Sequence, residues 1–329
     1  MKTIIKILIC SILPTLLLAA CGGKVQNGDG NGVDIHRYEQ AMFDTPAEKL
    51  PDALKAFKNG FDSPLLNIYP DDQQFVAQIA DFVADATVRD IYNITQQHYA
   101  DLRWLEKELT SAMKKARALD CGIDQMKVAT FVSGYFDYGS RILADRESKS
   151  VVVSIDQYAL GWMEKYSWFG LPMYIAELSD SAFLASDIMA EMARQFIAMP
   201  DEKNVTMLDL MVSEGKVLYF LDQVMPRKDE RLKIRYSEEQ MDWMRANESH
   251  VWAYFIQNDL LYEKDYNRYH NFTDEAPKTN AFKDSAPRTT QYIGWQIVRK
   301  YMENSKSTMK ELFDNTDSQS ILQISKYKP

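Results

Sequence analysis

Apolar residues recur every three or four positions over most of residues 34–125, which is the spacing of amphipathic helices. Prolines divide this region into shorter pieces, and Asp71 and Asp72 offer an N-cap for the helix that follows Pro70. The pattern therefore predicts a helical region over residues 34–125, with apolar positions at Phe75, Ile79, Phe82, Val83, Val88, Ile91, Tyr92, Leu102, Leu105, Leu109 and Met113.

The period changes in residues 126–160, where short runs rich in β-branched residues follow one another. Two runs cover residues 127–132 and 150–155, and residues 138–144 between them offer a third strand. Parallel neighbours need a connection of about a dozen residues or more, usually a helix, and these connections are too short for that. We therefore predict a small antiparallel sheet in this region.

Helical spacing returns over residues 161–329. It predicts two central helices, one over residues 181–199 and one from Thr206 to Pro226, and a third over residues 237–258 with further helices beyond. Together the three regions predict a mainly helical α+β fold, with residues 34–329 as a single domain.

Two carboxylates interrupt otherwise apolar stripes of these helices. Glu214 lies in the stripe of the second central helix, and Glu248 lies in the stripe of the helix over residues 237–258. A carboxylate on a buried face needs a partner, because burying an unpaired charge is costly.

The first 20 residues have the pattern of a secretory signal peptide. Lys2 and Lys6 precede an apolar run over residues 7–18, and the run ends in the lipobox Leu18-Ala19-Ala20-Cys21. An uncleaved anchor is the alternative, but its apolar run is shorter than the roughly 20 residues that span a membrane. We therefore expect residues 1–20 to be removed and Cys21 to be the lipidated first residue of the mature protein.

Residues 21–33 are polar and rich in glycine, so they predict a flexible tether spanning on the order of 15–20 Å as a coil. No Asp follows Cys21, which removes the usual reason for retention at an inner membrane. We expect a lipoprotein of the outer membrane that faces the periplasm and is attached through the lipid on Cys21.

Charge and cysteine content narrow the possible partners. Removing Lys2 and Lys6 takes the formal net charge from −9 to −11, and such an acidic protein is repelled by nucleic acid and by anionic lipid surfaces. Once Cys10 is removed and Cys21 is acylated, Cys121 has no partner for an intrachain disulfide, and we expect it to be a buried apolar residue.

The two central helices carry a pattern that is typical of zinc peptidases, with its ligands replaced. In such enzymes two His at positions i and i+4 of a helix bind the metal, and the Glu after the first His is the general base. Here that frame reads Ala190-Glu191-Met192-Ala193-Arg194. Alanine has no donor atom and a guanidinium has no lone pair to offer, so neither position can bind zinc. We expect no metal and no cofactor.

Glu214 stands where a downstream helix supplies the third ligand in one large branch of zinc peptidases. Our hypothesis is that Arg194 and Glu214, with Asp187 as a possible third member, form an ion pair in place of the metal. A guanidinium donating two parallel hydrogen bonds to a carboxylate suits such a site. The alternative is that Arg194 points to water and Glu214 lies at a helix edge.

Several longer segments resemble the gliding motility lipoprotein GldB family. They are the lipobox, the terminal KYKP, and residues 213–220, 247–255 and 293–299, which read SEGKVLYF, NESHVWAYF and IGWQIVR. The resemblance covers nearly the whole mature chain. It implies a cell-envelope component of the gliding machinery, with envelope protein partners and no established reaction. The family also looks like a distant relative of zinc peptidases, which implies a zincin-like fold.

The sequence thus favours a non-catalytic envelope lipoprotein with a degenerate zinc-peptidase fold. Two alternatives stay open. One is a hydrolase or metallopeptidase with unrecognised ligands, although none of the four His stands at i and i+4 from another. The second is a peptide- or glycan-binding module that uses the former active-site cleft.

Overall fold

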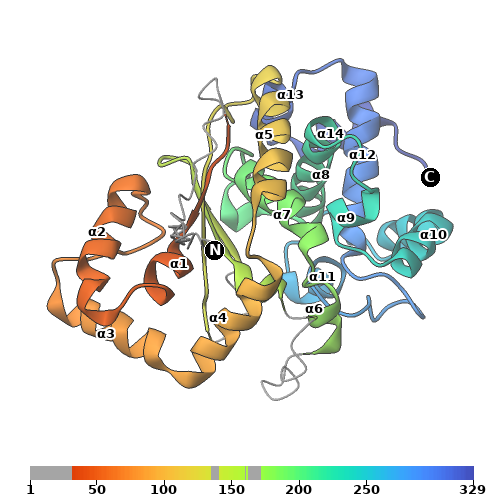
Figure 1. The fold of residues 1–329 in the computed structure, drawn as a ribbon. Helices are drawn as coiled ribbons and strands as arrows, with labels where there is room; N and C mark the ends of the chain where they lie inside the picture. Colours follow the sequence, from red (N-terminus) through yellow and green to blue (C-terminus); the bar gives the residue numbers. More distant parts are fainter. Residues whose placement is uncertain (1–31, 135–140, 160, 162–171) are drawn as a thin grey trace, which may run out of the picture. The chain divides into compact units, whose positions relative to one another are not determined.

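The computed structural model describes residues 32–134, 141–159, 161 and 172–329 (Figure 1). The predicted signal peptide, Cys21 and the tether as far as residue 31 lie outside the described residues. From Gly32 to Pro329 the chain forms one compact unit.

Helices make up most of the N-terminal region, and two of them begin at aspartate caps. Asp72 accepts hydrogen bonds from the backbone N–H groups of Gln74 and Phe75, and Asp85 accepts one from that of Val88. These caps begin the third and fourth of five helices, which are α1 (Tyr38–Phe43), α2 (Leu50–Gly60), α3 (Gln73–Ala84), α4 (Ala86–His98) and α5 (Arg103–Ala118). A 3-10 turn, Ala47–Lys49, precedes α2.

The sheet of the described chain is mixed, so the prediction of an antiparallel sheet is wrong. Its strands are β1 (Ile35–Arg37), β2 (Lys127–Phe131), β3 (Ile142–Asp145) and β4 (Ser150–Ser154), in the order β1-β2-β4-β3. β1 pairs with β2 and β2 pairs with β4 in parallel, and only β3 and β4 are antiparallel. β1 also lies inside the region that we predicted to be helical.

Strand order explains both errors. β3 returns at the outer edge of β4 and does not lie between β2 and β4, so the β3–β4 hairpin leaves β4 running in the same direction as β2. β1 reaches the opposite side of β2 through helices α1–α5, which supply the long connection that a parallel neighbour needs.

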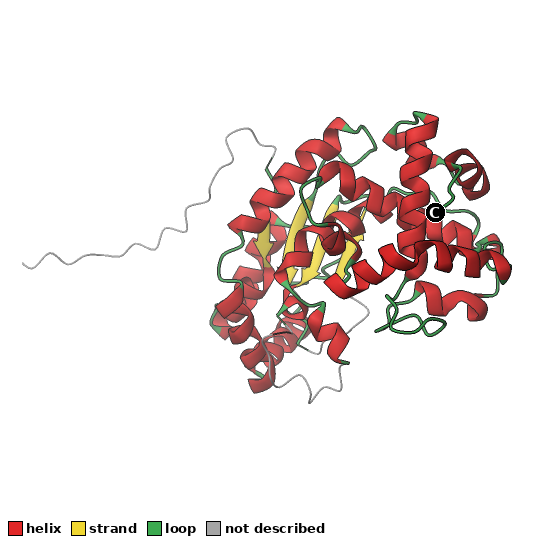
Figure 2. Cartoon of the chain, turned by 90° about the vertical axis from the view of Figure 1, so that its right-hand side faces the viewer, coloured by secondary structure: helices red, strands yellow, loops and turns green. Residues whose placement is uncertain are grey.

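Helices cover the sheet and form the rest of the domain (Figure 2). α7 (Ser181–Arg194) begins at the Asp180 cap and packs against β3, β4, α5 and α8 (Met207–Val224). It ends at Arg194, earlier than residue 199, the predicted end. The remaining helices are α6 (Met173–Glu177), α7 (Ser181–Arg194), α8 (Met207–Val224), α9 (Glu230–Ile234), α10 (Glu238–Gln257), α11 (Tyr266–Thr273), α12 (Thr289–Ser305), α13 (Met309–Asp314) and α14 (Ser318–Ser325).

Capping boxes fix where three of these helices begin. The Thr206 side chain accepts a hydrogen bond from the Asp209 N–H, while the Asp209 carboxylate accepts one from the Thr206 N–H. α10 begins in the same way with Ser237 and Gln240, and α13 does so at Thr308. The predicted helix over residues 237–258 therefore corresponds to α10 with its two flanking caps.

Two glycines let α8 and α12 touch backbone to backbone. A Cβ atom added at Gly215 would lie 2.3 Å from the carbonyl oxygen of Gly294, and one added at Gly294 would lie 1.8 Å from the carbonyl oxygen of Met211. No side chain fits at such distances. The contact fixes the height at which the two helices cross, and with it the position of Glu214, which precedes Gly215.

Replacing Gly294 with alanine should destabilise the domain by about 3 kcal/mol or more, because the new methyl group can be accommodated only if α8 and α12 separate. Gly60→Ala is the matched control: its Cβ would meet only ring atoms of His36 at 3.8 Å, which is an ordinary contact. Chemical denaturation measures both changes. Equal free energies of unfolding for the two variants would contradict the close crossing.

Candidate functional site

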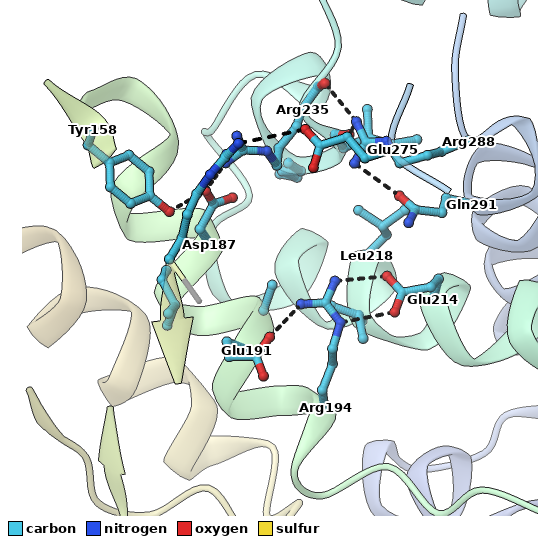
Figure 3. A pocket seen from close by; sticks show the side chains of 16 residues that line it. Tyr158, Asp187, Glu191, Arg194, Glu214, Leu218, Arg235, Glu275, Arg288 and Gln291 are labelled. Carbon is cyan, nitrogen blue, oxygen red and sulfur yellow. Dashed lines mark hydrogen bonds and ion pairs between the residues drawn. The ribbon is translucent and has the colours of Figure 1, made fainter. Parts of the chain in front are cut away.

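A polar cleft opens between α7, α8, α9 and the start of α12, and we call it the α7–α8 cleft (Figure 3). Its cavity has a volume of about 240 Å³. Besides these helices, the edge strand β3 and the 3-10 turn Ile155–Tyr158 contribute to its walls. The lining residues are Arg141, Ile142, Tyr158, Asp187, Ala190, Glu191, Arg194, Glu214, Val217, Leu218, Lys233, Ile234, Arg235, Glu275, Arg288 and Gln291.

Arg194 joins two carboxylates at one end of the cleft. Its Nε and Nη2 atoms donate to the two oxygens of Glu214 at 2.9 and 2.8 Å, and Nη1 donates to Glu191 at 3.0 Å. Glu191 lies one turn before Arg194 on α7, whereas Glu214 comes from α8. The two-point contact holds the guanidinium in one plane with the Glu214 carboxylate and joins the two helices.

Ala190 stands one helical turn before Arg194 and faces the same cleft. Ala190 is 7% exposed, and its side chain contributes only a methyl group to the wall of the cleft. Positions 190 and 194 of α7 therefore bring a methyl group and a guanidinium to the cleft.

Burial and pairing act in opposite directions on the ionisation of this pair. Burial favours the neutral form of Glu214, but the charge of Arg194 and its hydrogen bonds outweigh that effect and hold the pKa of Glu214 below its usual value. For Arg194, burial would lower the pKa, and the charge and hydrogen bonds of Glu214 raise it. Glu214 is thus ionised at neutral pH and is unsuited to act as a general acid.

Asp187 lines the same cleft but does not join the Arg194 pair. It pairs with Arg235 Nη1 and accepts a hydrogen bond from the Tyr158 hydroxyl at 2.7 Å. Arg235 follows α9 in the left-handed region, with φ 58°, and also donates to the Leu178 carbonyl at 2.7 Å. The possible third member of the ion pair therefore belongs to a second pair on another wall.

Glu248 does not line the cleft. It accepts a hydrogen bond from the Tyr327 hydroxyl at 2.7 Å, which ties α10 to the C-terminal segment. The carboxylate in the α10 stripe is thus accounted for by a contact with the end of the chain.

Spacing along the sequence gave no sign of the two cleft arginines that flank helices. Arg235 ends α9, and Arg288 is the N-cap of α12, with φ 47°. Charged residues in connecting segments are usually solvated, yet Arg288 is only 7% exposed. Pro287 and Thr289-Thr290 beside it indicate a helix start, but they do not indicate that Arg288 is buried.

A buried network holds α9 in place and so positions Arg235. Asp222 of α8 accepts hydrogen bonds from Lys233 at 2.8 Å, from Trp295 Nε1 at 2.9 Å and from Arg299 Nε at 2.8 Å. These donors come from α9 and α12. One carboxylate therefore fixes three helices that border the cleft.

Within the described part of the chain, no group of three or more His, Cys, Asp or Glu side chains is arranged to hold a metal ion. The polar groups that line the cleft are mainly guanidinium and carboxylate groups.

None of the described helices combines the length and apolar character needed to cross a membrane.

Fold and site together define a mainly helical α+β domain with a mixed sheet and a charged cleft closed at one end by an ion pair. The chain belongs to the gliding motility protein GldB family, whose model matches residues 24–329. Membership associates it with lipoproteins of the gliding machinery, and so with the cell envelope. No curated protein and no solved structure matches the chain.

The ion pair predicts a pH dependence of stability. Because the pKa of Glu214 is lowered on folding, its contribution is present above the unfolded value of about 4.3 and is lost as the pH falls through the folded value. The difference in unfolding free energy between wild type and Glu214→Gln should therefore be largest near neutral pH and shrink below about pH 4.3.

A double-mutant cycle with Arg194→Ala isolates the pair from the other carboxylates. At pH 7 we expect a coupling free energy of about 1–3 kcal/mol, between the ranges for exposed and buried pairs. Denaturation of the four chains across pH measures it. A coupling near zero, or one that grows in acid, would show that the pair does not stabilise the domain as described.

Proposed function

We propose that this chain is a non-catalytic outer-membrane lipoprotein, anchored through Cys21 and facing the periplasm, that serves the gliding machinery by binding. In this proposal α7 and α8 are the metal-binding helices of a zinc-peptidase-like fold whose ligands have been replaced. The observation that carries the proposal is the two-point contact between Arg194 and Glu214 across the α7–α8 cleft.

The positions of the three side chains support a former metal site. Zinc ligands in proteins lie about 2.0–2.2 Å from one common ion, so their side chains must converge. Ala190 and Arg194 line the cleft from one face of α7, and Glu214 reaches the Arg194 guanidinium from α8. Positions that correspond to two His and one Glu of a zinc peptidase thus border one small cavity.

The same residues argue against hydrolysis by that route. Ala190 has no atom that can bind a metal, and Arg194 places a permanent positive charge where the ion would be. Glu191, at the position of the general base, accepts a hydrogen bond from Arg194 at 3.0 Å. The proposed role of the ion pair is therefore to hold α7 and α8 together without a metal.

Restoring both histidines tests the geometry directly. The double variant Ala190→His/Arg194→His, with Glu214 unchanged, should bind one zinc ion per chain, because it regenerates two His one turn apart with a Glu opposite. The wild-type chain should bind none. Metal content is measured by mass spectrometry after dialysis against zinc.

Two variants, each lacking one of the three ligands, provide matched controls for this experiment. Arg194→His alone, and the triple variant that adds Glu214→Gln, should bind zinc much more weakly, since each lacks one of three ligands. Stoichiometric zinc in the wild-type chain would overturn the non-catalytic proposal and favour a metallopeptidase with other ligands. Failure of a folded double variant to bind zinc would remove the relation to zinc peptidases.

Anchoring has its own test. Cells grown with labelled palmitate should incorporate it into the wild-type chain, which should fractionate with the outer membrane. Cys21→Ser should abolish labelling, because the lipid is carried by that thiol. Cys121→Ser is the matched control and should still be labelled. Equal labelling of the Cys21→Ser variant would contradict attachment at this residue.

A further inference from the structure

We propose that the α7–α8 cleft binds an oxyanion, a carboxylate or phosphate group carried by a larger ligand, on the Arg288 guanidinium at the start of α12. The inference rests on the proposed use of the cleft for binding and names the chemical class that it takes. Figure 3 shows Arg288 at the edge of the cleft beside Gln291 and Glu275.

Arg288 is buried with its hydrogen-bonding capacity only partly used. Nη2 donates to the carbonyl oxygens of Ile234 at 3.0 Å and Arg235 at 2.8 Å, and Nη1 has only a 3.5 Å contact with Gln291. Nε is buried and has no hydrogen-bond partner. Buried polar atoms nearly always have one, so an unpartnered guanidinium N–H in a cleft wall indicates a missing acceptor.

Each of the other cations of the cleft lies within ion-pair distance of a carboxylate of the described chain. Arg194 pairs with Glu214, Arg235 pairs with Asp187, and Lys233 pairs with Asp222. Arg141 lies 3.9 Å from Glu275. Among the described residues Arg288 forms no ion pair, and all of its acceptors are neutral.

Electrostatics make this arrangement unfavourable without an anion. Burial lowers the pKa of Arg288, and the negative charge of Glu275 opposes that effect only in part. The walls of the cleft carry five basic side chains, and within the described chain four of them lie beside carboxylates, which leaves Arg288 without one. One bound oxyanion would balance the charge of Arg288 and accept a hydrogen bond from Nη1, whose contact with Gln291 is 3.5 Å long.

The N-terminus of α12 also favours binding of an anion in the cleft. α12 has 17 residues, and its N-cap, Arg288, makes no side-chain capping bond. An uncapped helix N-terminus carries a positive partial charge and free N–H groups, which favour an anion. The neighbouring Thr289 hydroxyl is also buried without a partner.

Cavity size limits what enters. A volume of about 240 Å³ is below the roughly 300–1,000 Å³ of pockets that enclose a whole small molecule. The cleft therefore accommodates a charged end group, with the remainder of the ligand outside. Carboxylate and phosphate ends share the recognition chemistry described here, and the experiment separates them.

Calorimetric titration tests the proposal on the full mature lipoprotein in detergent. Sodium phosphate and sodium acetate are the two probes, sodium chloride is the reference salt, and the ionic strength is held constant. We expect saturable one-to-one binding of one of the two probes. Phosphate preference identifies a phosphate end group, and acetate preference identifies a carboxylate. Binding of neither probe above the chloride reference would overturn the inference.

Two variants locate the anion. Arg288→Gln should weaken binding roughly tenfold or more, as for the loss of a charge-assisted hydrogen bond. Arg103→Gln, which removes a guanidinium whose side chain is 74% exposed, is the control and should leave binding unchanged. Equal affinity of Arg288→Gln and wild type would overturn the assignment to Arg288.

If Arg288→Gln does not fold, the variant Gln291→Glu tests the same site. It keeps Arg288 and places a carboxylate of nearly the same shape beside it, so the variant should melt at a higher temperature and no longer bind the anion. A lower melting temperature together with unchanged binding would contradict the proposal. The two proposals can fail separately. If the wild-type chain binds no anion but the Ala190→His/Arg194→His variant binds zinc, only the anion inference is refuted. If the wild-type chain binds zinc stoichiometrically, only the proposed function is refuted.

Discussion

The backbone contact between α8 and α12 is the constraint on which the cleft depends. Gly215 and Gly294 allow the helices to approach until no side chain fits between them. Glu214 precedes the first of these glycines, and Arg288 and Gln291 lie one to two turns before the second. The same contact therefore sets the distance between the carboxylate that pairs with Arg194 and the guanidinium at the start of α12.

Each wall of the cleft has its own ion pairs between basic and acidic side chains. Arg194 joins α7 to α8, Arg235 joins the end of α9 to Asp187 of α7, and Asp222 collects donors from α9 and α12. A metal ion would bring ligands from several helices to one point. Here the described helices are held by separate ion pairs, which leaves the space between them available for a ligand.

Helical periodicity places Ala190 and Arg194 on one face of α7, because spacing along a helix fixes which residues share a face. The pairing of Arg194 with Glu214, which lies on α8, was predicted from the zinc-peptidase pattern of two neighbouring helices, and the two side chains are in contact. Periodicity could not give the order of strands, since β3 lies outside β4 for reasons that depend on contacts distant in sequence. Nor could it find Arg235 and Arg288, which flank helices α9 and α12 in the left-handed backbone region and are largely covered by the helices packed around them. Asp187 faces the expected cleft, but its partner comes from one of these ends.

The central claim is that an ion pair takes the place of a metal between α7 and α8. A crystal of the wild-type chain grown with zinc, with diffraction recorded at the zinc absorption edge, tests it most directly. We predict no anomalous peak in the α7–α8 cleft and a guanidinium of Arg194 in two-point contact with Glu214. An anomalous peak between Glu191 and Glu214, with Arg194 turned away, would contradict it.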